Sequence, residues 1–325
     1  MPSIAAYEFV EFVETAVFLK DEPVFALADG TVRMPAGGER TVEAHSGGLL
    51  AARPDPWNGR LLTGGEDGRV VAVTPDGKAS ELATIGRKWV DRVAAGPNGV
   101  VGFASGRTAY VRLSDGTVKE FPQERTVEDI AFAPKGIRLA TARYNGASLY
   151  FAGTDSAPVQ LEWKGAHIAV MFSPDGRFLV TSMQENALHG WRLDDGQHMR
   201  MAGYPAKVKS WSWSAKGRYL ATAGAPVAVL WPFAGKTGPM GKAPLELGLR
   251  GDTMVTCVAC HPAEDMLAVG YADGMILAVR FADQKEALLR RGGTGAIQTM
   301  AWDREGRRLA FGSEMGEAGV IDIAG

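Results

Sequence analysis

The sequence is poor in cysteine and has no long apolar run. Cys257 and Cys260 are the two cysteines of the chain, which is too few for a framework of disulfide bonds. The most apolar stretch, residues 219–233, is too short to cross a bilayer and contains Pro226 and Pro232. These scarcities exclude the small disulfide-stapled folds and predict a protein with no membrane partner.

The sequence also lacks an excess of charge of one sign. It has 35 Lys and Arg residues against 37 Asp and Glu residues, and its pI is near 6.3. No general positive field points to nucleic acid, so a nucleic-acid-linked scaffold is disfavoured. The N-terminal segment has no basic stretch, and Glu8, Glu11 and Glu14 interrupt its apolar residues, which argues against a secretory signal. We therefore expect a cytoplasmic location.

What the sequence has in abundance is glycine, placed within a repeated pattern of strands and turns. Eight times an apolar strand is followed by a turn, a second apolar strand, a Gly/Asp turn and a third strand, most clearly in residues 129–151, 168–193 and 210–233. Self-similarity at roughly 40 residues indicates a β-propeller. We predict an all-β fold, with residues 1–325 forming a single closed β-propeller of eight four-stranded blades and seven blades as the alternative. The blades are expected to start near residues 15, 48, 90, 127, 167, 208, 254 and 296.

The N-terminal 14 residues precede the first of these units. Tyr7–Val13 alternates between apolar and polar residues, while the last unit ends at the C-terminus without a fourth strand. We therefore predict that residues 1–14 form a closing strand that pairs with the last blade and protects its edge. The first unit, Val17–Met34, is short and matches the pattern least well, which keeps the seven-bladed alternative open.

The turn between the first two strands of a unit resembles that of a known family. The segments FSPDGRFLVTS, WSAKGRYLATAG and FAPKGIRLATA are similar to the hairpins of WD-repeat (WD40) propellers. Trp191 and Trp231 stand where the WD dipeptide of that family begins, but Arg192 and Pro232 replace its Asp, and the Gly-His pair of the family is matched only loosely, at residues 165–167. The resemblance implies a WD-repeat propeller in which the buried His–Ser–Asp–Trp network of the family is largely absent. Its stability would then come mainly from apolar packing.

The string Cys257-Val258-Ala259-Cys260-His261 has the spacing of a haem attachment motif. On a strand, however, residues three apart point to opposite faces, so the two thiols would not share one ligand. Cys257 and His261 share a face but would lie roughly 13 Å apart. We interpret both cysteines as structural and expect no metal site and no cofactor.

Other motifs of enzymes are weak. Gly235-Lys236-Thr237 resembles the end of a phosphate-binding loop, but Leu230 occupies the position of its first glycine. No pair among the five histidines has helical metal-ligand spacing, His189 alternates with Trp191 as blade residues do, and no nucleophile elbow is present. We predict a protein that is not an enzyme. The alternative is a propeller enzyme, or a small-ligand or metal-binding protein, with its site at the channel mouth.

Basic and aromatic residues gather in the loops that the family would place on one face. We call this set the basic–aromatic face, because Arg beside aromatic side chains is typical of binding hot spots. Its predicted partner-binding residues are Arg87, Lys88, Trp89, Arg125, Arg143, Tyr144, Lys207, Lys209, Trp211, Arg250, Tyr271, Arg290 and Arg291. The alternative interpretation is a set of ordinary solvated loop charges. We expect a scaffold for protein–protein interaction, whose partner is another protein with an acidic or extended segment.

Overall fold

A computed structural model describes residues 2–324, which fold into antiparallel sheets and one short 3-10 helix, η1 (Pro97–Gly99). Met1 and Gly325, the ends of the predicted domain, lie outside the described residues. The chain forms two compact units. Among the described residues, unit 1 holds 2–28, 33–40 and 204–324, and unit 2 holds 29–32 and 41–203. No helix in residues 2–324 has the length and apolar character needed to cross a membrane.

Apart from the sheet that contains β1, each sheet of residues 2–324 is a meander in which consecutive strands pair antiparallel. Unit 1 contains the sheets β20-β21-β22-β23 (Trp211–Trp213, Tyr219–Thr222, Ala228–Pro232, Leu245–Leu247), β24-β25-β26-β27 (Val255–Cys260, Met266–Tyr271, Ile276–Arg280, Glu286–Arg290) and β28-β29-β30-β1 (Ile297–Trp302, Arg308–Ser313, Glu317–Asp322, Ser3–Glu8). Unit 2 contains β6-β7-β8-β9 (Leu49–Asp55, Arg60–Gly65, Arg69–Val73, Ala79–Thr84) and β10-β11-β12-β13 (Arg92–Ala95, Val101–Ser105, Thr108–Arg112, Val118–Pro122). The sheet β2-β3-β4-β5 (Val13–Leu19, Glu22–Leu27, Thr31–Met34, Arg40–Glu43) has residues in both units.

The remaining sheet of unit 2 has six strands, β14-β15-β16-β17-β18-β19 (Asp129–Phe132, Arg138–Phe151, Val159–Phe172, Phe178–Met183, Ala187–Arg192, His198–Met201). Its strands β15 and β16 are 14 residues long each, and β16 pairs with β15 in its first part and with β17 in its second. Two of the eight sequence units therefore share one sheet. Counted by hydrogen-bonded sheets within residues 2–324, the propeller has seven blades, and the prediction of eight separate blades is not supported.

The hairpins form where the turn residues predicted them. In the turn at Pro174–Gly176, the Ser173 hydroxyl donates to Asp175 Oδ1 at 2.6 Å, and the Arg177 amide donates to the same oxygen at 3.0 Å. Gly176 has a φ of 74°, a conformation that glycine adopts without steric cost. The Asp175 carboxylate thus accepts the Arg177 amide in place of a backbone carbonyl, and β17 begins directly after the turn.

Apolar side chains of neighbouring sheets pack together to form the core. In unit 2, Leu62 and Val70 of one sheet contact Val101 and Phe103 of the next, and all four are fully buried. Burial of a large aliphatic or aromatic side chain stabilises a fold by about 1.5–3 kcal/mol. Apolar packing between neighbouring sheets therefore stabilises unit 2.

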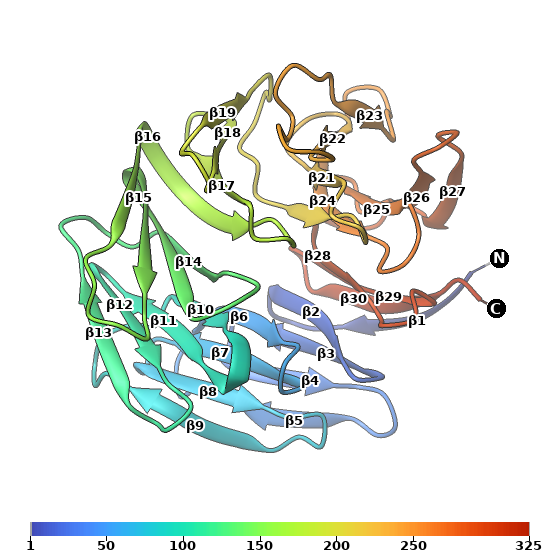
Figure 1. The fold of residues 1–325 in the computed structure, drawn as a ribbon. Coiled ribbons are helices and arrows are strands. Elements are labelled where there is room, and N and C mark those ends of the chain that lie inside the picture. The colour runs from blue at the N-terminus through green and yellow to red at the C-terminus, as the bar shows by residue number, and fades with distance from the viewer. Residues whose placement is uncertain (1, 325) are drawn as a thin grey trace. The chain divides into compact units, whose positions relative to one another are not determined.

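The N-terminal strand joins the C-terminal sheet of unit 1, as predicted (Figure 1). β1 pairs with β30 from Ser3 opposite Asp322 to Glu8 opposite Glu317. The predicted bounds of the closing strand, however, are wrong. Val10 is 99% exposed at a bend, and Val13 is a fully buried residue of β2. The bend turns the chain away from the edge of β30, so pairing with that edge ends at Glu8.

Candidate binding site

The structure divides the predicted basic–aromatic face into exposed and engaged side chains. In residues 2–324, seven of its members are exposed and form no ion pair: Arg87, Lys88, Trp89, Arg125 and Tyr144 in unit 2, and Lys209 and Arg291 in unit 1. Lys207 and Trp211 are half-buried. These nine side chains are consistent with a binding role. The other four, Arg143, Arg250, Tyr271 and Arg290, are held by neighbours within the fold, although Arg143 still lines a pocket.

Two arginines of unit 1 have structural partners instead of free guanidinium groups. Arg250 pairs with Asp273 at 3.1 Å, and its guanidinium lies 5.0 Å from the centre of the Tyr271 ring. Arg290 pairs with Glu317 at 2.7 Å. Tyr271 is fully buried, and its hydroxyl donates to the Gly248 carbonyl, so its placement on the predicted face is wrong. The sequence could not show this, because loop arginines that pair across sheets look the same as free ones.

The structure brings three predicted residues together in unit 2. Arg125, Arg143 and Tyr144 line a cavity of about 500 Å³, which we call the β15 pocket. The other lining residues are Pro122, Gln123, Glu124, Asn145, Ser148, Tyr150, Pro158, Gln160 and Glu162. The pocket therefore mixes cationic, amide and carboxylate groups with flat rings.

One wall of the β15 pocket is the continuous pairing of β15 with β16. Tyr144 lies opposite Ala166, and Gly146 lies opposite Glu162 across a bulge. Gly146 has a φ of 131°, and a Cβ at this position would collide with a backbone carbonyl oxygen of β16. Asn145, whose φ is 66°, accepts a hydrogen bond on Oδ1 from the Gly165 amide at 3.2 Å. The wall lies within the predicted unit that starts near residue 127, and bulges of this kind often aim side chains at sites.

Arg143 is fixed within the β15 pocket. Its Nε donates to Ser148 Oγ at 3.0 Å, and its Nη2 donates to Gln160 Oε1 at 2.7 Å and to Glu162 Oε1 at 2.5 Å. The side chain is 12% exposed. Its Nη1 also donates to the Tyr144 and Asn145 carbonyls, so the guanidinium is a rigid lining group whose charge is already compensated by Glu162.

The side-chain amide of Gln123 also lines the β15 pocket. The Gln123 side-chain oxygen accepts from the Thr141 hydroxyl at 3.1 Å, while Gln123 Nε2 is buried without a hydrogen-bond partner within the described chain. Burial raises the pKa of Tyr150, so its hydroxyl stays protonated at neutral pH. The pocket lining contains no histidine and no cysteine. Nor do three His, Cys, Asp or Glu side chains of residues 2–324 gather to hold a metal ion.

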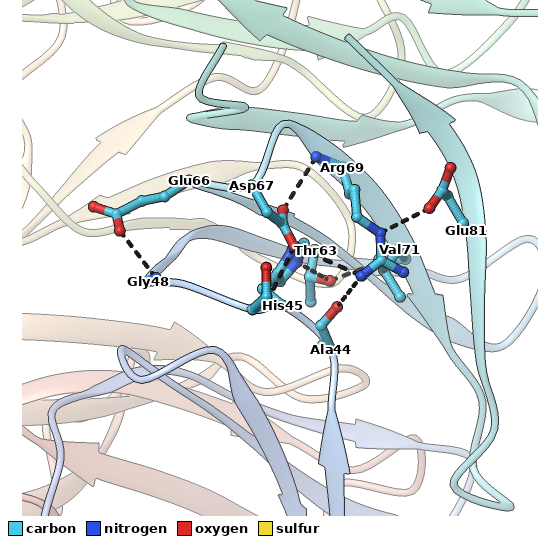
Figure 2. A network of polar contacts seen from close by, with 10 residues as sticks. Ala44, His45, Gly48, Thr63, Glu66, Asp67, Arg69, Val71 and Glu81 are labelled. Carbon is cyan, nitrogen blue, oxygen red and sulfur yellow. Dashed lines mark hydrogen bonds and ion pairs between the residues drawn. The ribbon is translucent and has the colours of Figure 1, made fainter. Parts of the chain in front are cut away.

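A second polar network, at the β6–β9 sheet, supports the fold of unit 2 (Figure 2). His45 Nδ1 lies 2.9 Å from Asp67 Oδ1, and His45 Nε2 lies 2.9 Å from the Thr63 hydroxyl, which is also 3.2 Å from the Val71 carbonyl. The Ser46 amide donates to Asp67 Oδ2 at 3.1 Å. The expectation that this type of network is largely absent is therefore wrong for this sheet.

The protonation of His45 and Asp67 follows from the directions of their pKa shifts. Burial lowers the pKa of His45, although the hydrogen bond and charge of Asp67 oppose this shift. Burial raises the pKa of Asp67, but hydrogen bonds from His45 and the Ser46 amide outweigh it, so that its pKa is lowered. At neutral pH we infer a neutral imidazole that donates from Nδ1 to an ionised carboxylate.

Comparison with known proteins gives one match to a family model and a similar fold. Residues 246–277 match the family model described as "WD domain, G-beta repeat". The chain carries a WD40 repeat. Its fold is similar to that of the computationally designed Ika8 protein, known from a crystal structure, with a TM-score of 0.77 and 18% sequence identity over 97% of this chain and 98% of that one. This likeness concerns the fold alone. No curated protein matches the sequence.

A recurring Thr identifies buried polar residues that the sequence analysis did not single out. Four second strands begin with the pattern X-Leu-X-Thr, and each Thr hydroxyl contacts a polar side chain earlier in the chain. The pairs are Thr63 with His45, Thr141 with Gln123, Thr181 with His167, and Thr222 with Tyr204. The recurrence of Thr at the fourth strand position was the available signal. The partners vary in type, which hides the repeat from a search for one fixed motif.

The cysteines lie inside the matched WD40 repeat. Cys257 packs with Ala259 in one cluster, while Cys260 packs beside Val258 in another, so the two thiols point to opposite faces of β24 as predicted. Burial raises the pKa of Cys257 to about 11 and that of Cys260 to about 12. Both thiols are therefore protonated and poorly nucleophilic at neutral pH.

His189 of β18 offers a test of how a buried group affects the stability of unit 2. It is fully buried, stacks on Trp163 with ring centres 4.1 Å apart, and has no hydrogen-bond partner for either ring nitrogen within the described residues. Burial lowers its pKa to about 3. The unfolded chain, with a histidine pKa near 6.5, then binds more protons, so the stability due to His189 falls by about 2 kcal/mol from pH 7 to pH 5.

We expect His189→Phe to keep the stack on Trp163 and to raise the free energy of unfolding at pH 7 by about 1–2 kcal/mol, because two unpartnered nitrogens are removed. Chemical unfolding at pH 7 and pH 5 measures both effects. The variant should also lose less stability than the wild type between these pH values. A variant with lower stability and an unchanged pH dependence would contradict this account of His189.

Proposed function

We propose that the protein is a non-catalytic WD40 scaffold that binds another protein at the β15 pocket of unit 2. The family fold supports a role in protein interaction in general. The observation that carries the finer proposal is the convergence of Arg125, Arg143 and Tyr144 on one cavity. Rigid propellers that present Arg and aromatic side chains bind at low entropic cost. The cytoplasmic location stays a prediction from the sequence, as does the absence of a nucleic-acid partner.

The pocket also marks the place where the repeat is interrupted. Elsewhere in unit 2 the outer strand and the next inner strand are separate, whereas β16 continues from one to the other. Departures from a local rule that packing does not require are often functional. Here the departure builds a wall beside Tyr144 and Asn145, which supports the pocket as the binding site.

The experiment compares two basic–aromatic pairs of unit 2. Arg125→Glu with Tyr144→Ala alters the β15 pocket, while Arg87→Glu with Trp89→Ala makes the same chemical change at an exposed loop that does not line it. A partner captured from native cytosol and then purified is titrated against the wild type and both double variants. We expect the pocket pair to weaken binding by about 10-fold or more and the loop pair by no more than about 2-fold. Equal effects, or a larger effect of the loop pair, would contradict the proposal.

A small-ligand site is the second candidate, because a volume of about 500 Å³ also suits a small molecule. This function is favoured if a small molecule stabilises the wild type in thermal unfolding but does not stabilise the Arg125→Glu, Tyr144→Ala double variant. Partner binding by that variant should then be unchanged.

A further inference from the structure

We propose that the β15 pocket accepts a single carboxylate side chain next to an aromatic side chain, both from an extended segment of the partner. Arg125 pairs with the carboxylate, and the ring lies against Tyr144. This inference rests on the proposed function and specifies the chemistry of its partner.

The charges of the lining favour one carboxylate. Arg143 is compensated by Glu162 at 2.5 Å, so it offers little attraction to a further anion. Arg125 is exposed and forms no ion pair within residues 2–324. The remaining lining carboxylate, Glu124, brings the formal charge of the lining to zero, so Arg125 can pair with one carboxylate while a second anionic group would find no further cation.

The rings of the lining favour an aromatic neighbour. Tyr144 is 53% exposed, and Pro122 and Pro158 add rigid flat surfaces to the lining. Tyrosine supplies a large contact area with few rotatable bonds, so stacking on it costs little entropy. An extended segment presents adjacent side chains together with free backbone carbonyls. Since Asn145 Oδ1 is already engaged by Gly165, its amide nitrogen remains as a donor for one of these carbonyls.

Short synthetic peptides test the chemistry without the natural partner. The probe is acetyl-Gly-Glu-Tyr-Gly-amide, and its two matched controls replace Glu by Gln or Tyr by Ala. Binding is measured by calorimetric titration at low salt. For the wild type we expect each replacement to weaken binding by about 5-fold or more, since a charge-assisted pair and a stacked ring are lost in turn.

Variants assign the two preferences to residues. Arg125→Gln should bind the Glu and Gln peptides equally while retaining the preference for Tyr, and Tyr144→Ala should show the converse. Arg87→Gln, an exposed arginine that does not line the pocket, should behave as the wild type. Circular dichroism and thermal unfolding confirm that each variant is folded.

The inference is overturned if the wild type binds none of the peptides, if it does not distinguish Glu from Gln, or if Arg125→Gln keeps that distinction. Partner binding that depends on Arg125 while every peptide fails would refute the carboxylate–aromatic pair and leave the proposed function standing. Partner binding that is insensitive to Arg125 would refute the proposed function itself.

Discussion

Removal of residues 1–8 is expected to destabilise the protein more than any other change considered. β1 forms six residue pairs with β30, and its loss would expose that strand as an unpaired edge. Tyr7 would also leave the Phe25 ring, from which its own ring centre is 5.7 Å away. We expect the free energy of unfolding to fall by about 3–5 kcal/mol, because cross-strand pairs and core contacts are lost together. Chemical unfolding and light scattering measure the loss and the resulting aggregation.

Single substitutions distinguish the loss of specific β1 contacts from a general effect of shortening the chain. Tyr7→Ala should lower the free energy of unfolding by about 1–3 kcal/mol, because it removes ring contacts with the core. Val10→Ala, at the exposed bend that follows β1, should leave it unchanged within about 0.5 kcal/mol. A shortened protein with the stability and solubility of the full chain would show that β1 does not hold the C-terminal sheet.

Substitution of Asp67 by Ala is expected to have the second-largest effect. Asp67 accepts from His45 and from the Ser46 amide, and the His45 imidazole is buried against Thr63 (Figure 2). Without the carboxylate, the buried imidazole of His45 loses its acceptor, and the exposed Ser46 amide loses its own. We expect a loss of about 3 kcal/mol in chemical unfolding, in the range measured for broken buried networks.

Asp76→Ala is the matched control. Asp76 also accepts a side-chain hydrogen bond and pairs with Lys78 at 2.7 Å, but it lies in an exposed turn of the same sheet. Exposed pairs contribute little, so the change should be within about 0.5 kcal/mol. Equal losses for Asp67→Ala and Asp76→Ala would mean that the buried network does not stabilise unit 2.

The hairpins and the class of fold could be predicted because their causes are local. A turn such as Pro174–Gly176 carries its own backbone preferences, and alternation on β24 places Cys257 and Cys260 on opposite faces. The six-stranded sheet could not be predicted in this way. Whether β16 ends or continues depends on its pairing with β15 and β17, and that pairing is a long-range property.

The residue types of the candidate site could be predicted from the sequence, but the residues that come together in space could not. Residue type marked Arg125, Arg143 and Tyr144 for binding, and it marked Arg290 and Tyr271 equally well. Only the fold separates them, because Arg290 finds Glu317 on another strand and Tyr271 is buried. The wall that completes the pocket depends on the bulge at Gly146, and no local sequence motif predicts this bulge.

Hydrogen–deuterium exchange of the protein with and without its purified partner tests the β15 pocket most directly. The proposal predicts slower exchange in peptides that cover residues 122–126, 143–148 and 158–166, which contain or border the pocket lining. It predicts unchanged exchange at the exposed loop 86–89 and at the hairpin turn 174–177. Protection confined to that loop or that turn, with none at the pocket segments, would contradict the β15 pocket as the binding site.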